Sequence, residues 1–269
     1  MFAKLKSIFG VDSVSEKKII FWSDDVTDYP APVPAASAIP EWWRKTKSYG
    51  AFKSYSKTDE KEINVNSGGD NATIKRCVPV LDSMSMGYLV LTPADMYVEP
   101  KHVHTTENKD GPTQDFSMVY PRRHERIDAH PWGQASKHPY ATQQPLAKVF
   151  VPWRVALPEG YSLIITEPLN NPSPHWSVVS GVMDSDVFFP KLNFMISMKE
   201  EKFTGIIPMK TPIAQLIPFK REKWSSVVID DAARSGVQED SREKIINSRL
   251  AKVFSAAYKK FFWSKKDFR

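Results

Sequence analysis

The sequence predicts a mainly β protein with an extended N-terminal arm and a C-terminal amphipathic helix. From residue 72 onward, short apolar segments recur between turn residues, a pattern that is typical of all-β domains. The chain holds 21 prolines against 11 glycines, and proline favours short strands and ordered loops because it fixes φ and lacks a backbone donor. The last 30 residues change to an apolar period of three and four, which indicates one helix.

We expect residues 1–71 to form an arm. A short strand is predicted at 18–22, and residues 29–40 read YPAPVPAASAIP, which predicts an extended, polyproline-like segment. A short helix should follow at 41–45, because Pro40 suits a helix start. Residues 54–71 are polar and are expected to form a loop.

We expect residues 72–224 to form the β body, beginning with the segment 72–81. Residues 121–147 are rich in histidine and proline and are predicted to be a long loop within it. The strands of the body are predicted at 87–91, 96–98, 116–120, 149–151, 163–166, 177–179, 194–196, 203–207 and 213–219.

Residues 225–269 should form a linker and a basic helix. Asp240 and Glu243 fit a capping box. The formal charge of the chain is +6, yet residues 242–269 alone carry nine basic and two acidic side chains, so the remainder is nearly neutral. Such a tail either contacts nucleic acid, anionic lipid or an acidic protein surface, or is a solvated helix face.

The composition excludes several classes of protein. The sequence contains no apolar run long enough to span a membrane. Its single cysteine, Cys77, allows no internal disulfide. It has neither a glycine-rich phosphate loop nor a Gly-x-Ser-x-Gly elbow, and we expect no cofactor.

Three segments carry a resemblance to a known fold. They are LPEGYSLII at 157–165, GVMDSD at 181–186 and TPIAQLIPF at 211–219. In order and spacing they resemble the core of the dUTPase-like (β-clip) family. The resemblance implies a β-clip or β-sandwich body over about a quarter of the chain, and it implies a trimer.

The resemblance also suggests what an active site would contain. If the chain is an enzyme, Asp184 would orient the attacking water and Gln215 would lie near the base or sugar. The chain departs from the family at Val187, where a tyrosine is expected, and at 166–171, where an Arg-Ser-Gly segment would bind phosphate. The glycine-rich C-terminal arm is missing too, so we expect no catalysis and interpret residues 184–186 as a polar turn whose carboxylates accept local backbone hydrogen bonds.

Two histidines in the pattern His-Val-His raise the possibility of a metal. His102 and His104 would share one face of a strand, a spacing seen in cupin metal sites. A third ligand would come from His124, Glu125, Asp128 or His130. The competing interpretation is an ordered surface loop, which we favour.

The whole chain is also similar to a family of uncharacterised proteins from tailed bacteriophages. The similarity rests on residues 39–45, on 73–92, which we interpret as a strand pair, and on 181–224. It implies a non-enzymatic virion or assembly protein that associates with itself and with other phage structural proteins. The location that the resemblance implies is the virion, or the host cytoplasm during infection. The alternative is a nucleotide-binding or nucleotide-hydrolysing protein of the dUTPase and dCTP-deaminase group.

Overall fold

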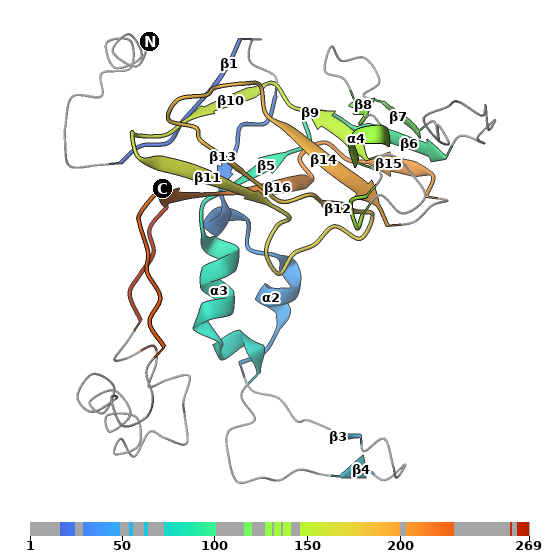
Figure 1. The fold of residues 1–269 in the computed structure, drawn as a ribbon. Helices are drawn as coiled ribbons and strands as arrows, with labels where there is room; N and C mark the ends of the chain where they lie inside the picture. The colour runs from blue at the N-terminus through green and yellow to red at the C-terminus, as the bar shows by residue number, and fades with distance from the viewer. Residues whose placement is uncertain are drawn as a thin grey trace, which may run out of the picture. The chain divides into compact units, whose positions relative to one another are not determined.

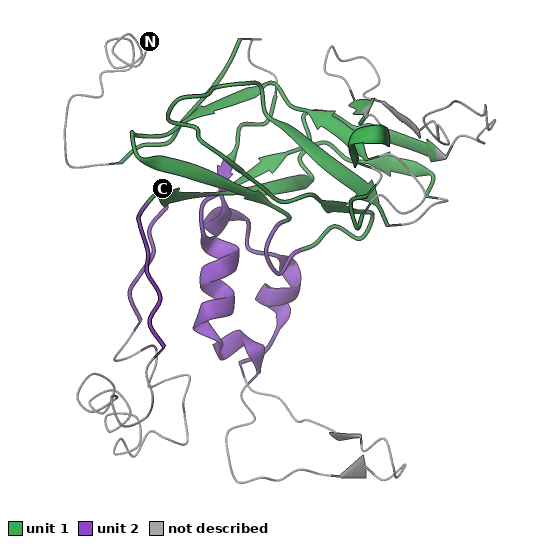
Figure 2. Cartoon of the chain, in the orientation of Figure 1, with its two compact units in different colours: residues 1–32, 89–167, 172–221 green, residues 33–88, 168–171, 222–269 purple. Residues whose placement is uncertain are grey.

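The computed structural model describes residues 17–24, 29–48, 54–55, 62–63, 73–100, 116–119, 127–130, 132–135, 137–140, 146–199, 203–228, 259 and 263–268. The described chain is mainly β, as predicted (Figure 1). It divides into two compact units (Figure 2). The first comprises residues 1–32, 89–167 and 172–221, and the second comprises 33–88, 168–171 and 222–269.

The first unit is built almost wholly from strands. They are β1 (Ile20–Ser23), β5 (Tyr88–Leu91, whose first residue is assigned to the second unit), β6 (Met96–Pro100), β7 (Phe116–Val119), β8 (Ile127–Ala129), β9 (Ala147–Phe150), β10 (Trp153–Ala156), β11 (Tyr161–Thr166), β12 (Trp176–Val178), β13 (Gly181–Met183), β14 (Asn193–Met198), β15 (Gly205–Ile207) and β16 (Pro212–Lys220). They form sheets in the orders β1-β10, β13-β11-β16-β5, β12-β14-β9-β8 and β15-β6-β7.

These sheets share one hydrophobic core. Leu163 of β11, Trp176 of β12 and Phe194 of β14 are almost completely buried and belong to the same cluster. Alternation along β14 and β9 points every second side chain inward. Each large apolar side chain buried in this way contributes roughly 1.5–3 kcal/mol to stability.

The register of three strands brings distant segments together. β11 pairs antiparallel with β16 from Tyr161↔Lys220 to Thr166↔Gln215. On its other side β11 pairs antiparallel with β13, with Leu163 opposite Met183. The beginning of β11 therefore lies beside the end of β16 and close to the residues that follow β13 (Figure 1).

The second unit contains the described helices other than α4. Its elements are β2 (Val33–Pro34), the 3-10 helix η1 (Ala35–Ala38), α2 (Glu41–Lys45), β3 (Ser54–Tyr55), β4 (Glu62–Ile63), the 3-10 helix η2 (Ile74–Arg76) and α3 (Val78–Ser85). The predicted helix at 41–45 is confirmed, and Trp43 anchors it with only 3% of its surface exposed.

The prediction of a strand pair at 73–92 is wrong in its first half, because the chain is helical at Ile74–Arg76 and Val78–Ser85. Pro79 occupies the first turn of α3, where its missing N–H costs no hydrogen bond and its fixed φ suits the helix. The preceding residue Cys77 is extended and serves as the N-cap. The strand of this predicted pair that exists is β5 (Tyr88–Leu91).

The predicted long loop at 121–147 also contains regular structure. It holds β8 (Ile127–Ala129), which pairs with β9 (Ala147–Phe150), and the short helix α4 (Trp132–Ala135). Most of the predicted C-terminal helix lies outside the described residues, apart from Lys259 in helical conformation. In the described part of the chain, no helix has the length and apolar character needed to cross a membrane.

Candidate functional site

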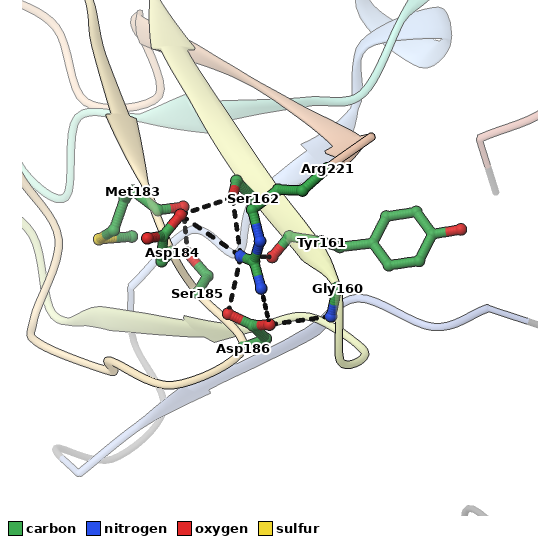
Figure 3. Close-up of polar contacts among 8 residues, drawn as sticks. All are labelled: Gly160, Tyr161, Ser162, Met183, Asp184, Ser185, Asp186 and Arg221. Atoms are coloured by element: carbon green, nitrogen blue, oxygen red, sulfur yellow. Dashed lines mark hydrogen bonds and ion pairs between the residues drawn. The ribbon is translucent and has the colours of Figure 1, made fainter. Parts of the chain in front are cut away.

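Arg221, which directly follows β16, is the centre of the polar cluster in the first unit. Its Nη1 atom lies 2.9 Å from Ser162 Oγ, 3.1 Å from Tyr161 O and 3.0 Å from Asp186 Oδ1. Its Nη2 atom pairs with Asp186 Oδ2, which makes the contact with this carboxylate bidentate. Figure 3 shows the guanidinium between the carboxylates of Asp184 and Asp186.

Asp186 is the buried member of this cluster. Its side chain is 2% exposed, against 40% for Arg221. Besides the guanidinium it accepts a hydrogen bond from the amide of Gly160, at 2.9 Å. Gly160 lies in the turn just before β11. Its φ of 82° is a left-handed conformation that favours glycine.

The electrostatics follow from these contacts. The hydrogen bond from Arg221 lowers the pKa of Asp186 below its ordinary value of 3.8, and burial opposes this effect. The same hydrogen bond raises the pKa of the Arg221 guanidinium. Asp186 is therefore a carboxylate, and Arg221 a cation, at any pH near neutrality.

Asp184 occupies the outer side of the cluster. Its Oδ1 atom accepts a hydrogen bond of 2.6 Å from the hydroxyl of Ser162 and lies 3.3 Å from Nη1 of Arg221. Its side chain is 59% exposed. Together the two aspartates and Arg221 join the beginning of β11, the turn after β13 and the end of β16; we call these three side chains the Arg221 clamp.

The interpretation of 184–186 as a turn is supported by its backbone, in which the amides of Val187 and Phe188 both donate to Asp184 O. The expected local backbone donors are confirmed only in part, because the backbone amide of Asp186 contributes to holding its own carboxylate, while most contacts come from distant residues. The side chains of Asp184 and Asp186 contact Ser162, Gly160 and Arg221, which are 22 to 37 residues away. Sequence reasoning missed Arg221, because only strand register brings it to the turn.

Gln215 is not brought to the clamp. It lies opposite Thr166, whereas Ser162 lies opposite Phe219. Four residues of β16 separate these pairs, which corresponds to about 13 Å along the strand. Gln215 is 1% exposed and belongs to the interior, so Asp184 and Gln215 do not share an open site.

Residues 168–171, in the loop after β11, belong to the second unit and contact its helices. Within that unit, Asn170 O accepts a hydrogen bond of 3.0 Å from the indole of Trp42, and Asn170 Nδ2 donates to Ser83 Oγ at 2.8 Å. Asn170 holds φ of 56°. This segment, 168–171, lies within the stretch where the dUTPase resemblance would place phosphate contacts, and here it serves packing.

The metal candidates His102 and His104 lie outside the described residues, as do His124 and Glu125. Asp128 and His130 are described. Within the described ranges, no group of three His, Cys, Asp or Glu side chains is arranged to hold a metal ion.

Comparison with known proteins adds little. No family model matches the chain, and no curated protein matches it significantly. One matching solved structure is a mutant of the dUTPase of Staphylococcus bacteriophage 80alpha with dUpNHpp, at 14% identity and a TM-score of 0.24. The match covers 57% of this chain and 79% of that chain. A TM-score this low does not indicate a shared fold.

Proposed function

We propose that this chain is a non-enzymatic structural or assembly protein of a tailed bacteriophage, in which a dUTPase-like β-clip body serves self-association. It would act in the virion, or in the host cytoplasm during assembly, beside other phage structural proteins. The basic tail at 242–269 would contact nucleic acid or an acidic protein surface.

The observation that carries this proposal is that Arg221 binds the carboxylates of both Asp184 and Asp186. A general base must reach a water molecule and must have a pKa near the working pH. The Asp186 carboxylate is buried and makes a bidentate contact with Arg221. Its pKa lies below the ordinary value, so it is a weak base. Asp184 shares its Oδ1 atom between Ser162 and Arg221.

Two further placements support the same conclusion. Gln215, the residue that would contact a base or sugar, is enclosed in the core. The loop that would hold phosphates is used instead for contacts of Asn170 with Trp42 and Ser83. Glu167, just before this loop, is an acid where the resemblance places a phosphate-binding arginine, and it pairs with Lys199 at 3.3 Å.

A second candidate function is binding or hydrolysis of a deoxynucleotide. The observation that favours it is the 59% exposure of the Asp184 side chain, which leaves this carboxylate in contact with solvent. In this function Asp184 would act on a water molecule beside a bound nucleotide.

One assay separates the two functions. The purified full chain is incubated with each deoxynucleoside triphosphate, and pyrophosphate release and thermal shift are measured for wild type, Asp184→Asn and Asp24→Asn. Asp24 is the matched control, because its side chain is 52% exposed and also pairs with an arginine, Arg154. The structural proposal predicts neither release nor shift in any chain.

Release that is lost in Asp184→Asn and retained in Asp24→Asn would overturn the structural proposal and establish the second candidate. The positive test of the structural role is the protein content of purified virions and of assembly intermediates. A chain absent from both would contradict it.

A further inference from the structure

The strand β13 (Gly181–Met183) stands at the edge of the sheet ordered β13-β11-β16-β5. Val182, its central residue, is 65% exposed. A Cβ added at Gly181 would meet nothing within 4 Å. Edge strands with exposed apolar side chains are ready templates for pairing with another strand.

Apolar side chains continue beyond the strand. Val187 is 72% exposed and Phe188 is 61% exposed, and both follow the turn within two residues of Asp186. Three exposed apolar side chains, those of Val182, Val187 and Phe188, therefore lie within seven residues of the sequence, on either side of the turn that the Arg221 clamp binds. We call these three residues the β13 edge patch.

The neighbours of Val182 are complementary to themselves. In an antiparallel pair of two identical strands with Val182 opposite Val182, residue 180 lies opposite 184 and residue 181 opposite 183. The Ser180 hydroxyl contacts Thr166 Oγ1 at 3.1 Å, and either atom can be the donor; with Thr166 donating, this register sets the Ser180 O–H beside the exposed carboxylate of Asp184. A hydroxyl donor then faces a charged acceptor twice, once on each side of the symmetry axis.

We propose that β13 pairs with β13 of a second copy of this chain across a two-fold axis at Val182, which joins two sheets into one continuous sheet. This inference rests on the self-association in the proposed function and assigns it a surface. A two-fold contact of this kind is isologous, since the same patch serves on both copies. Met183 packs against the core, so the alternating Val182 side chain faces the other side and meets its copy there.

Phe188 and Val187 extend the contact beyond a three-residue ladder. Burial of an aromatic ring removes roughly 150–250 Å² from solvent, which a short strand pair needs because an isolated pair of strands is marginal in water. No like charges face each other in this register, since Asp184 lies opposite Ser180 rather than opposite Asp184.

The register can be tested by cross-linking. In a Cys77→Ser background, Val182→Cys gives a chain with one thiol, and a residue paired with its own copy has a Cα separation of about 4.5–5.5 Å, which suits a disulfide. Under mild oxidation we expect a covalent dimer. Ser180→Cys in the same background should not cross-link, because its copy would lie about 13 Å away.

Sedimentation gives the second measurement. Val182→Lys sets two like charges opposite each other and should dissociate the contact, whereas Ile206→Lys should not. Ile206 is the matched control because it is 64% exposed and lies on β15 of another sheet. Ile206→Cys is the corresponding control for cross-linking, and it should react no faster than free thiols in solution.

The outcomes distinguish this inference from the proposed function. Equal cross-linking of Val182→Cys and Ile206→Cys, or an oligomer that persists in Val182→Lys, overturns the β13 contact while self-association of the wild type still stands. Nucleotide hydrolysis together with a Val182→Cys dimer overturns the proposed function and retains the contact. A wild-type chain that stays monomeric at its highest soluble concentration overturns both.

Discussion

Asp186 and Arg221 form an ion pair in which the acid is buried and the base is not: their side chains are 2% and 40% exposed. The free energy cost of burying a carboxylate is met only while its partner is present. The pair therefore makes the turn after β13 dependent on a residue 35 positions later in the chain.

Removal of the Arg221 guanidinium should lower the stability of the fold. In Arg221→Met the buried Asp186 carboxylate loses its bidentate partner and keeps the Gly160 amide, so we expect the unfolding temperature to fall by several degrees. Thermal unfolding at pH 7 measures this. The exposed pair of Glu41 and Lys45 is the control, and Lys45→Met should change the unfolding temperature little. Equal effects of the two variants would contradict a structural role for Arg221.

Neutralisation of Asp186 should destabilise the fold less than removal of Arg221 does. Asp186→Asn keeps the size of the side chain and loses the charge, and we expect a loss of about 1–2 kcal/mol in the free energy of unfolding. Urea unfolding at pH 7 gives the value. Asp95→Asn is the comparison, because Asp95 also accepts a backbone amide, that of Met209, but has no arginine in that contact. Asp186→Asn should cost more than Asp95→Asn.

The difference in the free energy of unfolding between wild type and Asp186→Asn should depend on pH. Because the folded-state pKa of Asp186 lies below its ordinary value of 3.8, the stability that it contributes is fully present above that value. It is lost as pH falls from 3.8 through the lower folded pKa. Urea unfolding at pH 7, 5 and 3 should show a constant gap between 7 and 5 and a smaller one at 3. A gap that grows at pH 3 would have the wrong sign.

Asn170 should tolerate glycine better than a β-branched residue. Its φ of 56° is open to glycine and costly for valine, and either change removes the hydrogen bond to Ser83. We expect Asn170→Val to be less stable than Asn170→Gly by about 1–3 kcal/mol. The comparison of the two variants cancels the shared loss, and chemical unfolding measures it. Equal stabilities would show that the left-handed conformation is not kept in solution.

Asp82 on α3 should hold the C-terminal segment of the second unit. It accepts hydrogen bonds from the indole of Trp263 at 2.9 Å and from Lys266 at 2.8 Å. In Asp82→Ala we expect faster amide hydrogen exchange over residues 263–268, because the segment loses both contacts. Trp263→Phe, which keeps a ring and loses the indole donor, should give an intermediate rate. Unchanged exchange in Asp82→Ala would count against this anchor.

Most strands of the first unit could be predicted because each is a local pattern, whereas β8, β10 and β13 lie outside the predicted segments. The segments that became β11 and β16 are apolar, short and bounded by turn residues, so the class of fold follows from neighbours in sequence. A strand is predicted where α3 lies because Val78 and Val80 favour strands. Pro79 in the first turn instead favours the start of a helix. The Arg221 clamp could not be predicted, since no local signal states which residues strand register will bring together.

The position of Arg221 also has a mechanical consequence. Its backbone amide donates to Gly160 O at 2.8 Å, while its side chain binds the turn after β13. A force applied to the chain beyond Arg221 therefore acts first on its contacts with Gly160 and with Asp186, and only then on the hydrogen bonds between β11 and β16. The end of β16 is held by one backbone contact and one side-chain contact. Under tension this strand should stay paired with β11 until the ion pair between Arg221 and Asp186 ruptures.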